Sequence, residues 1–171
     1  YYARVPRYNH ENTNSRASSP TANTVAMYSY GNYYTWAAAI ASVKEYTSAT
    51  STDDEGKTSE TANTSLCPTG WRLPYGRSTG NGATAGGFSN LDIALGGTGA
   101  YQSTSLRWRT FPNNFLYSGG FYTSSANSRG GGGRYWSSTA SSNIDSYRTS
   151  LYSTRVDPGN GSNHKYSGYS I

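Results

Sequence analysis

Hydrophobic residues recur at helical spacing in two stretches of the chain. In the first, Trp36, Ile40 and Val43 follow one another at intervals of four and three, which places them on one face of a helix. Asn32 is suited to cap its first turn, because an asparagine oxygen can accept a hydrogen bond from a free backbone N–H. The pattern predicts a helix that starts after Asn32 and ends near Tyr46.

The second stretch, residues 88–97, predicts another helix. Ser89 and Asp92 lie three positions apart, as in a capping box, which makes Ser89 the expected N-cap. Phe88 and Ile93 stand on either side of that cap at the spacing of a hydrophobic staple. The core face is expected to comprise Leu91 and Leu95, and the helix to end at Gly96 and Gly97.

From residue 115 onward the hydrophobic period shortens to two, the period of a strand. Tyr147, Thr149 and Leu151 share one face, whereas Arg148, Ser150 and Tyr152 share the other. The run Asp157–Gly161 has the Asp, Pro, Gly and Asn residues of a turn. Strands are expected at residues 25–30, 115–122, 135–139, 147–153 and 166–171.

These elements predict an α+β fold, with two helices followed by a mostly antiparallel, loop-rich β region. A length of 171 residues suits one domain. Residues 1–24 are rich in Asn, Ser, Thr and Arg, so they are expected to form an extended lead-in to a single domain at 25–171.

The composition favours a surface that binds through tyrosine. The chain has 17 Tyr but only 4 Phe and 4 Trp, and charged residues make up 13%. Tyr, Ser, Gly and Asn dominate antibody-like binding loops, where tyrosine supplies rigid contact area. The same composition also suits ordinary Tyr-rich strands with polar loops, so both interpretations stay open.

The net charge of +5 raises the question of nucleic acid. The arginines are scattered, and the densest group is Arg107-Trp108-Arg109. Because no stripe of neighbouring cations could neutralise several phosphates, no nucleic-acid partner is expected. No apolar run approaches the ~20 residues of a membrane-spanning helix, so this chain is expected to have no membrane span.

The sequence predicts neither a cofactor nor an enzyme. Asp53-Asp54-Glu55 could attract Ca²⁺, but it lacks the alternating spacing of an EF-hand loop and is expected to be a solvated part of a long loop. The two histidines, His10 and His164, are too few for a three-histidine metal site. No Gly-x-Ser-x-Gly elbow is present. The glycine run 130–133 precedes a strand rather than a helix, so it is expected to be a flexible connection, not a phosphate loop.

The segment Cys67-Pro68-Thr69-Gly70-Trp71-Arg72-Leu73-Pro74 is the most distinctive in the chain. Prolines at both ends bracket a short predicted strand. Within it, the side chains of Trp71 and Leu73 are expected to face the core, and Gly70 permits a bend. Most of the motif is therefore expected to be structural, as is Trp136 in a later strand.

This motif resembles that of the Fibrobacter succinogenes major paralogous domain family, whose members are C-type-lectin-like. Three further segments agree in order, and the likeness covers roughly residues 28–171. They are Tyr30–Trp36, Tyr135-Trp136-Ser137-Ser138 and Gly168-Tyr169-Ser170-Ile171. The resemblance implies an extracellular domain of a bacterial surface protein. The family usually continues into Arg-Cys after the last segment, which implies a disulfide partner for Cys67 beyond Ile171; otherwise Cys67 is expected to be a buried free thiol.

The resemblance also implies that a ligand binds to the long loops of the β half. The expected partner is a glycan or a protein on another cell, which makes the chain an adhesin-like module. The alternative is a structural subunit of an extracellular filament or pilus, whose partners are identical subunits. The residues expected to form the binding face are Tyr117, Tyr122, Arg129, Arg134, Tyr147 and Tyr152.

Overall fold

The computed structural model describes residues 33–41, 64–76, 87–100, 103, 107–110, 113, 115–122 and 125–171. These residues form an α+β arrangement with antiparallel sheets. The expected lead-in at 1–24, the strand at 25–30, the cap Asn32, His10 and the acidic group at 53–55 lie outside the described residues.

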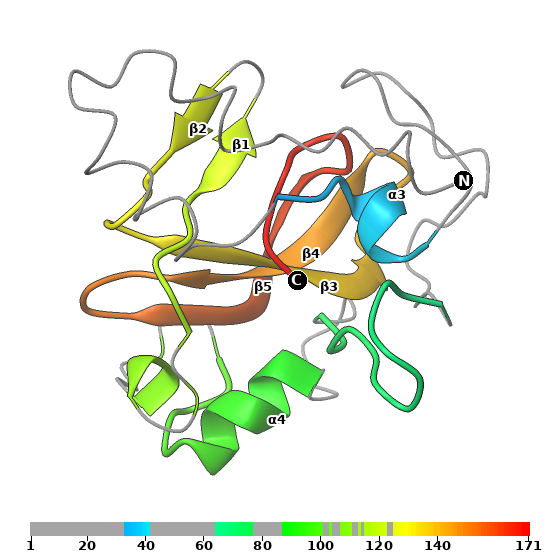
Figure 1. Ribbon diagram of the computed structural model, residues 1–171. Coiled ribbons are helices and arrows are strands. Elements are labelled where there is room, and N and C mark those ends of the chain that lie inside the picture. The colour runs from blue at the N-terminus through cyan, green and yellow to red at the C-terminus, as the bar shows by residue number, and fades with distance from the viewer. Residues whose placement is uncertain are drawn as a thin grey trace.

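A three-stranded antiparallel sheet in the order β3-β4-β5 forms the centre of the described region (Figure 1). Its strands are β3 (Gly133–Ala140), β4 (Asp145–Leu151) and β5 (Val156–His164). A two-stranded hairpin, β1 (Gly120–Tyr122) with β2 (Ser125–Asn127), lies beside it. The expected strands at 135–139 and 147–153 therefore correspond to β3 and β4. The last segment pairs through isolated bridges of Gly168, Tyr169 and Ser170, not through a continuous strand.

The two faces of the sheet cover two separate hydrophobic cores. Trp136 of β3 is paired with Arg148, whereas Leu151 of β4 is paired with Gly133, so Trp136 and Leu151 lie on opposite faces. The first core contains Trp36, Ala39, Ile40, Leu73, Trp136, Ala140 and Tyr169. The second contains Phe88, Trp108, Leu151 and Val156, with Phe115 and Tyr135 packed against it.

The helix α3 (Trp36–Ala39) supplies the first core but is shorter than its sequence pattern predicts. Thr35, not Asn32, is its N-cap and accepts a hydrogen bond from the backbone N–H of Ala38. The helix ends early because the Leu66 N–H donates to the Ala39 carbonyl and the Thr64 hydroxyl donates to the Ile40 carbonyl. These contacts satisfy carbonyls that a longer helix would have used. The prediction was therefore wrong at residues 40–41, where the helix has ended, and its remaining part, 42–46, lies outside the described residues.

The helix α4 (Gly87–Ala94) covers the second core, where Leu91 and Leu95 pack as predicted. Its start differs from the predicted one. Ser89 lies inside the helix and donates to the Pro158 carbonyl of β5, so it is not the cap. Ile93 is 53% exposed and forms no staple with the buried Phe88. The helix ends at Ala94, and Gly96, just beyond it, has a φ of +81°, which glycine adopts easily.

The acidic Asp92 of α4 is fully buried and has a different role from the predicted capping box. Its carboxylate accepts hydrogen bonds from the Trp108 indole N–H, at 2.7 Å, and from the Gly99 backbone N–H, at 2.8 Å. Trp108 belongs to the short 3-10 helix η2 (Arg107–Arg109). Asp92 therefore joins α4 to η2 and to the loop that follows α4.

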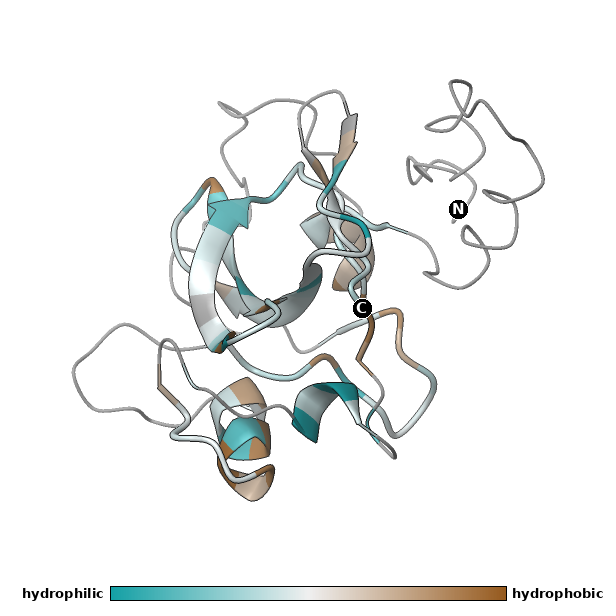
Figure 2. Ribbon diagram, turned by 90° about the vertical axis from the view of Figure 1, so that its left-hand side faces the viewer, coloured by the Kyte–Doolittle hydropathy of each residue, from teal (hydrophilic) through white to brown (hydrophobic). Residues whose placement is uncertain are grey.

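Strands β3 and β4 are rich in hydroxyl residues. Most of the sheet ribbon is pale in the hydropathy view, whereas α4 carries strongly hydrophobic residues (Figure 2). Buried hydroxyls are satisfied within the sheet: Ser137 donates to the Tyr147 carbonyl at 2.8 Å, and Ser146 donates to the Thr139 carbonyl at 3.0 Å. Such pairing removes the cost of burying a polar group. A low hydrophobic content is therefore compatible with a packed core.

The run Asp157–Gly161 is part of β5 and not the predicted turn. The β4–β5 register shifts here, since Arg148 pairs with Gly161 and Ser150 pairs with Asp157. Gly159 has a φ of +70°, and its N–H donates to the Thr149 hydroxyl. The Pro and Gly residues thus form a bulge, because the neighbouring strand keeps the chain paired on both sides of it.

Trp71 is the main correction to the predicted core. It is 76% exposed, and residues 71–76 form no strand. The Trp71 N–H donates to the Pro68 carbonyl and closes a turn in which Gly70 has a φ of +86°, so the predicted bend is present. Leu73 is buried as predicted, and Cys67 is a free, partly buried thiol that packs against the first core.

Gly120 marks a close approach between β1 and Tyr169. A Cβ at this position would lie 2.4 Å from the Tyr169 ring, which is fully buried. We expect Gly120→Ala to lower the free energy of unfolding by about 1–3 kcal/mol, because the ring has no free space to move into. Urea denaturation of the two proteins measures the difference, and equal midpoints would contradict this packing.

Candidate functional site

The glycine-rich turn that leads into β3 is held by hydrogen bonds. The N–H groups of Gly131 and Gly132 both donate to the Ser128 carbonyl, at 3.0 and 2.8 Å, and the Gly130 N–H donates to the Tyr117 carbonyl at 2.8 Å. The turn is therefore bonded to its surroundings rather than being the flexible connection that its composition predicted. Because these N–H groups donate within the protein, they do not form a phosphate cradle.

A small pocket opens between this turn and the ends of β3 and β4. Its volume is about 170 Å³, and its described lining consists of Ser128, Gly131, Gly132, Gly133, Arg134, Leu151 and Tyr152. Pockets for drug-sized ligands typically measure about 300–1,000 Å³. The pocket is therefore of a size to accept one small group of a larger ligand.

Tyrosine and arginine side chains pair around the pocket. The Tyr117 hydroxyl donates to the Tyr152 carbonyl at 3.0 Å. The Arg109 guanidinium carbon lies 5.0 Å from the Tyr117 ring centroid, and that of Arg155 lies 4.5 Å from the Tyr152 ring centroid. These are cation–π distances. Stacking orders each arginine and leaves polar edges of its guanidinium available for hydrogen bonds.

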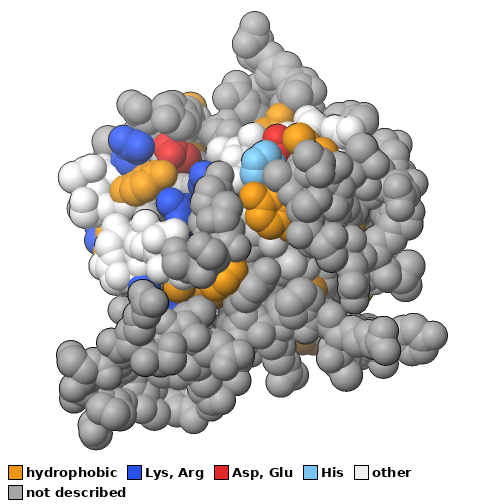
Figure 3. Space-filling model, turned by 90° about the horizontal axis from the view of Figure 1, so that it is seen from above, with side chains coloured by type: hydrophobic (Ala, Val, Ile, Leu, Met, Phe, Trp, Pro, Cys, Tyr) orange, Lys and Arg blue, Asp and Glu red, His pale blue; other side chains and the backbone are white. Residues whose placement is uncertain are grey.

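Two further contacts hold these arginines. Arg109 donates to the Ser153 carbonyl at 3.0 Å, and the Arg155 Nε lies 3.8 Å from an Asp157 carboxylate oxygen. Seen from above, the described surface has Lys or Arg side chains gathered beside hydrophobic ones on one side (Figure 3). We call the group of Arg109, Tyr117, Arg134, Tyr152 and Arg155 the Tyr–Arg surface.

Of the six predicted ligand-binding residues, Arg134 and Tyr152 line the pocket, and Tyr117 is bonded to the Tyr152 carbonyl. Arg129 turns instead toward Tyr33, and its Nε donates to the Tyr33 hydroxyl at 3.3 Å. Tyr147 packs against Gly76, so closely that a Cβ added to Gly76 would lie 2.4 Å from the Cβ of Tyr147. Since Tyr147 is four residues from Leu151, or about 13 Å along β4, it does not belong to this surface. The Tyr122 side chain lies outside the described part.

Sequence reasoning missed Arg109 and Arg155 as members of the surface. Arg109 belongs to the densest basic group of the sequence, which was considered only for nucleic acid. Arg155 is three residues after Tyr152, in the β4–β5 connection, and a hairpin connection brings such residues together. The three-residue separation of Tyr152 and Arg155 was therefore the feature of the sequence that could have indicated their contact.

One hydroxyl near the pocket is held in its protonated form. Tyr135 accepts a hydrogen bond from the Leu116 N–H and donates to the Leu116 carbonyl, both at 2.9 Å. Burial raises the pKa of the Tyr135 hydroxyl, because the charged phenolate is poorly solvated there. The uncharged Tyr135 hydroxyl therefore joins β3 to the segment before β1 through two hydrogen bonds.

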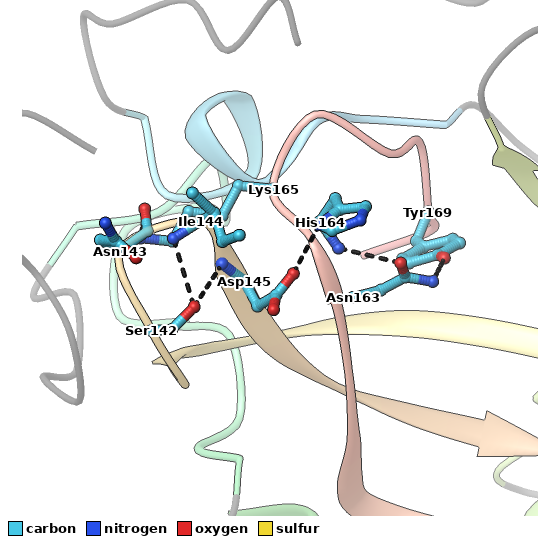
Figure 4. A network of polar contacts seen from close by, with 8 residues as sticks. All are labelled: Ser142, Asn143, Ile144, Asp145, Asn163, His164, Lys165 and Tyr169. Carbon is cyan, nitrogen blue, oxygen red and sulfur yellow. Dashed lines mark hydrogen bonds and ion pairs between the residues drawn. The ribbon is translucent and has the colours of Figure 1, made fainter. Parts of the chain in front are cut away.

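A second polar cluster joins the start of β4 to the end of β5 (Figure 4). The His164 Nδ1 lies 2.8 Å from an Asp145 carboxylate oxygen. The Ser142 hydroxyl accepts from the N–H groups of Ile144 and Asp145, at 3.2 and 2.9 Å. The buried Lys165 ammonium donates to the Asn143 carbonyl at 3.1 Å.

This cluster contains a His–Asp pair but is not assembled as a nucleophile triad. The His164 ring stacks on the Tyr166 ring, with centroids 5.3 Å apart. Within the described part of the chain, no hydroxyl or thiol is hydrogen-bonded to its imidazole, as a triad would require. The pair instead fastens the two strand ends.

Among the described residues, no group of three or more His, Cys, Asp or Glu side chains is placed to hold a metal ion. No helix in the same residues is long and apolar enough to cross a membrane. In comparisons with known proteins, no family model, no curated protein and no solved structure matches the chain.

Proposed function

We propose that the chain is an extracellular binding domain of a bacterial surface protein, C-type-lectin-like, which recognises a glycan or protein ligand through the Tyr–Arg surface. The observation that carries the proposal is the clustering of Tyr117, Tyr152 and stacked arginines around a pocket sized for one small group. Tyrosine and arginine are enriched where binding energy concentrates. The family resemblance adds the bacterial surface as the setting.

The order of this surface in the free protein supports binding. Tyr152 is stacked by Arg155, Tyr117 is stacked by Arg109, and the Tyr117 hydroxyl is bonded to a backbone carbonyl. Side chains that are already ordered lose less conformational entropy when a ligand binds. The surface is thus prepared to contribute contact area and hydrogen bonds at low cost.

Replacing Tyr152 by alanine tests the proposal. The bond from Tyr117 goes to the Tyr152 backbone carbonyl, which alanine retains, so the fold should be little affected. We expect Tyr152→Ala to weaken binding by about 2 kcal/mol, or roughly 30-fold, if the ring is a binding hot spot. Glycan-array and host-cell binding measure the effect.

Gly131→Leu provides an independent block of the pocket. Gly131 lines it, and a Cβ there would meet only the Ser128 carbonyl oxygen, at 3.8 Å. The matched control is Asn90→Ala, which alters an exposed position on α4, and it should bind as the wild type does. Equal binding by all four proteins would remove this surface from the proposal. Ordered polymers of the purified protein in electron micrographs would favour the filament subunit instead.

A further inference from the structure

Two arginines on neighbouring strands face the same aromatic ring. The Arg134 and Arg148 guanidinium carbons lie 5.9 and 5.6 Å from the Tyr169 ring centroid. Arg134 is paired with Ser150 and Trp136 with Arg148, so the two arginines are diagonal neighbours on one face of the sheet. Both are half-buried, and Arg134 also lines the pocket.

The described carboxylates do not neutralise this pair. Asp92 accepts from Trp108 and Gly99, Asp145 pairs with His164, and Asp157 pairs with Arg155. A half-buried cation without a counter-charge is costly, because the protein replaces only part of its hydration.

Arg148 also has unused hydrogen-bonding capacity. One of its terminal nitrogens donates to the Ser150 hydroxyl, but its Nε is buried and has no hydrogen-bond partner in the described part of the chain. A buried donor without an acceptor is rare in proteins. Because the Nε itself is buried, a ligand can meet only the terminal nitrogens of the half-buried Arg148. The planar guanidinium forks of two arginines match carboxylate and sulfate groups well.

We propose that Arg134 and Arg148 bind the carboxylate or sulfate group of an acidic glycan. The inference rests on the proposed function, since it names the class of ligand. Arg134 belongs to the Tyr–Arg surface, and Arg148 is its diagonal neighbour on β4. A glycan is favoured because the pocket admits one small group, while the tyrosine rings offer flat contact for the rest of a repeating polymer. The anionic group enters beside Arg134, and the polymer lies along the Tyr–Arg surface.

Three forms of one polymer test the charge requirement: neutral dextran, carboxymethyl-dextran and dextran sulfate. We expect the full chain to bind either charged form at least tenfold more tightly than neutral dextran, and the preference between those two forms identifies the anion. Arg134→Gln and Arg148→Gln should each weaken that binding about tenfold, since each removes a charged hydrogen-bond donor. Arg134→Lys should restore only part of it, because lysine lacks the planar fork.

Arg72→Gln is the matched control. Arg72 is exposed and lies over the Tyr75 ring at 3.9 Å, so the variant loses the same charge and the same kind of stacking on a different segment. Its binding should change less than twofold. If it weakens binding as much as Arg134→Gln does, net charge rather than the arginine pair governs binding, and the inference is wrong.

Thermal unfolding separates binding from structure. Arg148→Gln removes a charge that no described carboxylate compensates, so the melting temperature of the variant should not fall below that of the wild type. Loss of binding together with a lower melting temperature in both glutamine variants would make the arginines structural and overturn the inference.

The remaining outcomes distinguish this inference from the proposed function. Equal binding of neutral and charged dextrans would overturn the inference, while the proposed function would stand. Tighter binding of poly-glutamate than of dextran sulfate would replace the glycan by an acidic protein. Absence of binding to every glycan and every cell type would overturn the proposed function as well.

Discussion

The Trp136→Ala variant is expected to lose about 3–5 kcal/mol of unfolding free energy, the cost of removing a large buried aromatic side chain. Trp136 is fully buried, and its ring centroid lies 4.5 Å from that of Tyr169. Its indole N–H donates to the Tyr34 carbonyl at 2.8 Å, so the substitution also leaves that buried contact unmade. Urea denaturation followed by far-ultraviolet circular dichroism measures the loss without relying on tryptophan fluorescence.

Trp71→Ala is the matched control for this prediction. Both variants lose one indole, but Trp71 is 76% exposed, so its replacement should change stability by no more than about 0.5 kcal/mol. A loss of stability as large as that of Trp136→Ala would contradict the exposed position of Trp71 and would support the buried position that its motif predicted.

The second large effect is expected at Asp92. Asp92→Ala leaves the Trp108 indole N–H and the Gly99 backbone N–H without their acceptor in a buried site. Each unsatisfied buried donor costs about 1–3 kcal/mol, so we expect a loss of about 3 kcal/mol. Chemical denaturation measures the loss.

Asp92→Asn separates the hydrogen bonds from the charge. Its amide oxygen can still accept one of the two hydrogen bonds, whereas its NH₂ group cannot accept the other. We expect a stability between those of the wild type and Asp92→Ala. If alanine is tolerated as well as asparagine, then Asp92 does not join α4 to η2.

Local patterns predicted the elements whose cause is local. The position of α4 follows from the spacing of Leu91 and Leu95 and from the glycines after it, and these features act within one helix. The alternation of residues around Leu151 in the sequence likewise predicted β4. In the structure both faces of this strand are covered, since Thr149, Ser150 and Leu151 are all buried.

The errors arose where another segment of the chain competes for the backbone. The end of α3 is set by hydrogen bonds from residues 64–66, which are distant in sequence from Ala39. The turn chemistry of Asp157–Gly161 became a bulge because β4 pairs with the chain on both sides. Trp71 follows a proline turn that directs it outward, and alternation alone does not determine which face is buried.

The sequence alone determined the α+β class, the positions of β3, β4 and α4, and the abundance of tyrosine that suggested a binding surface. Which tyrosines and arginines meet was decided only by the tertiary structure, because sheet register and chain connections set distances between residues far apart in sequence. For the same reason, the pairing of Arg134 with Arg148 over Tyr169 is absent from any local pattern. The candidate site is therefore a product of strand pairing, and its residues were only partly predictable.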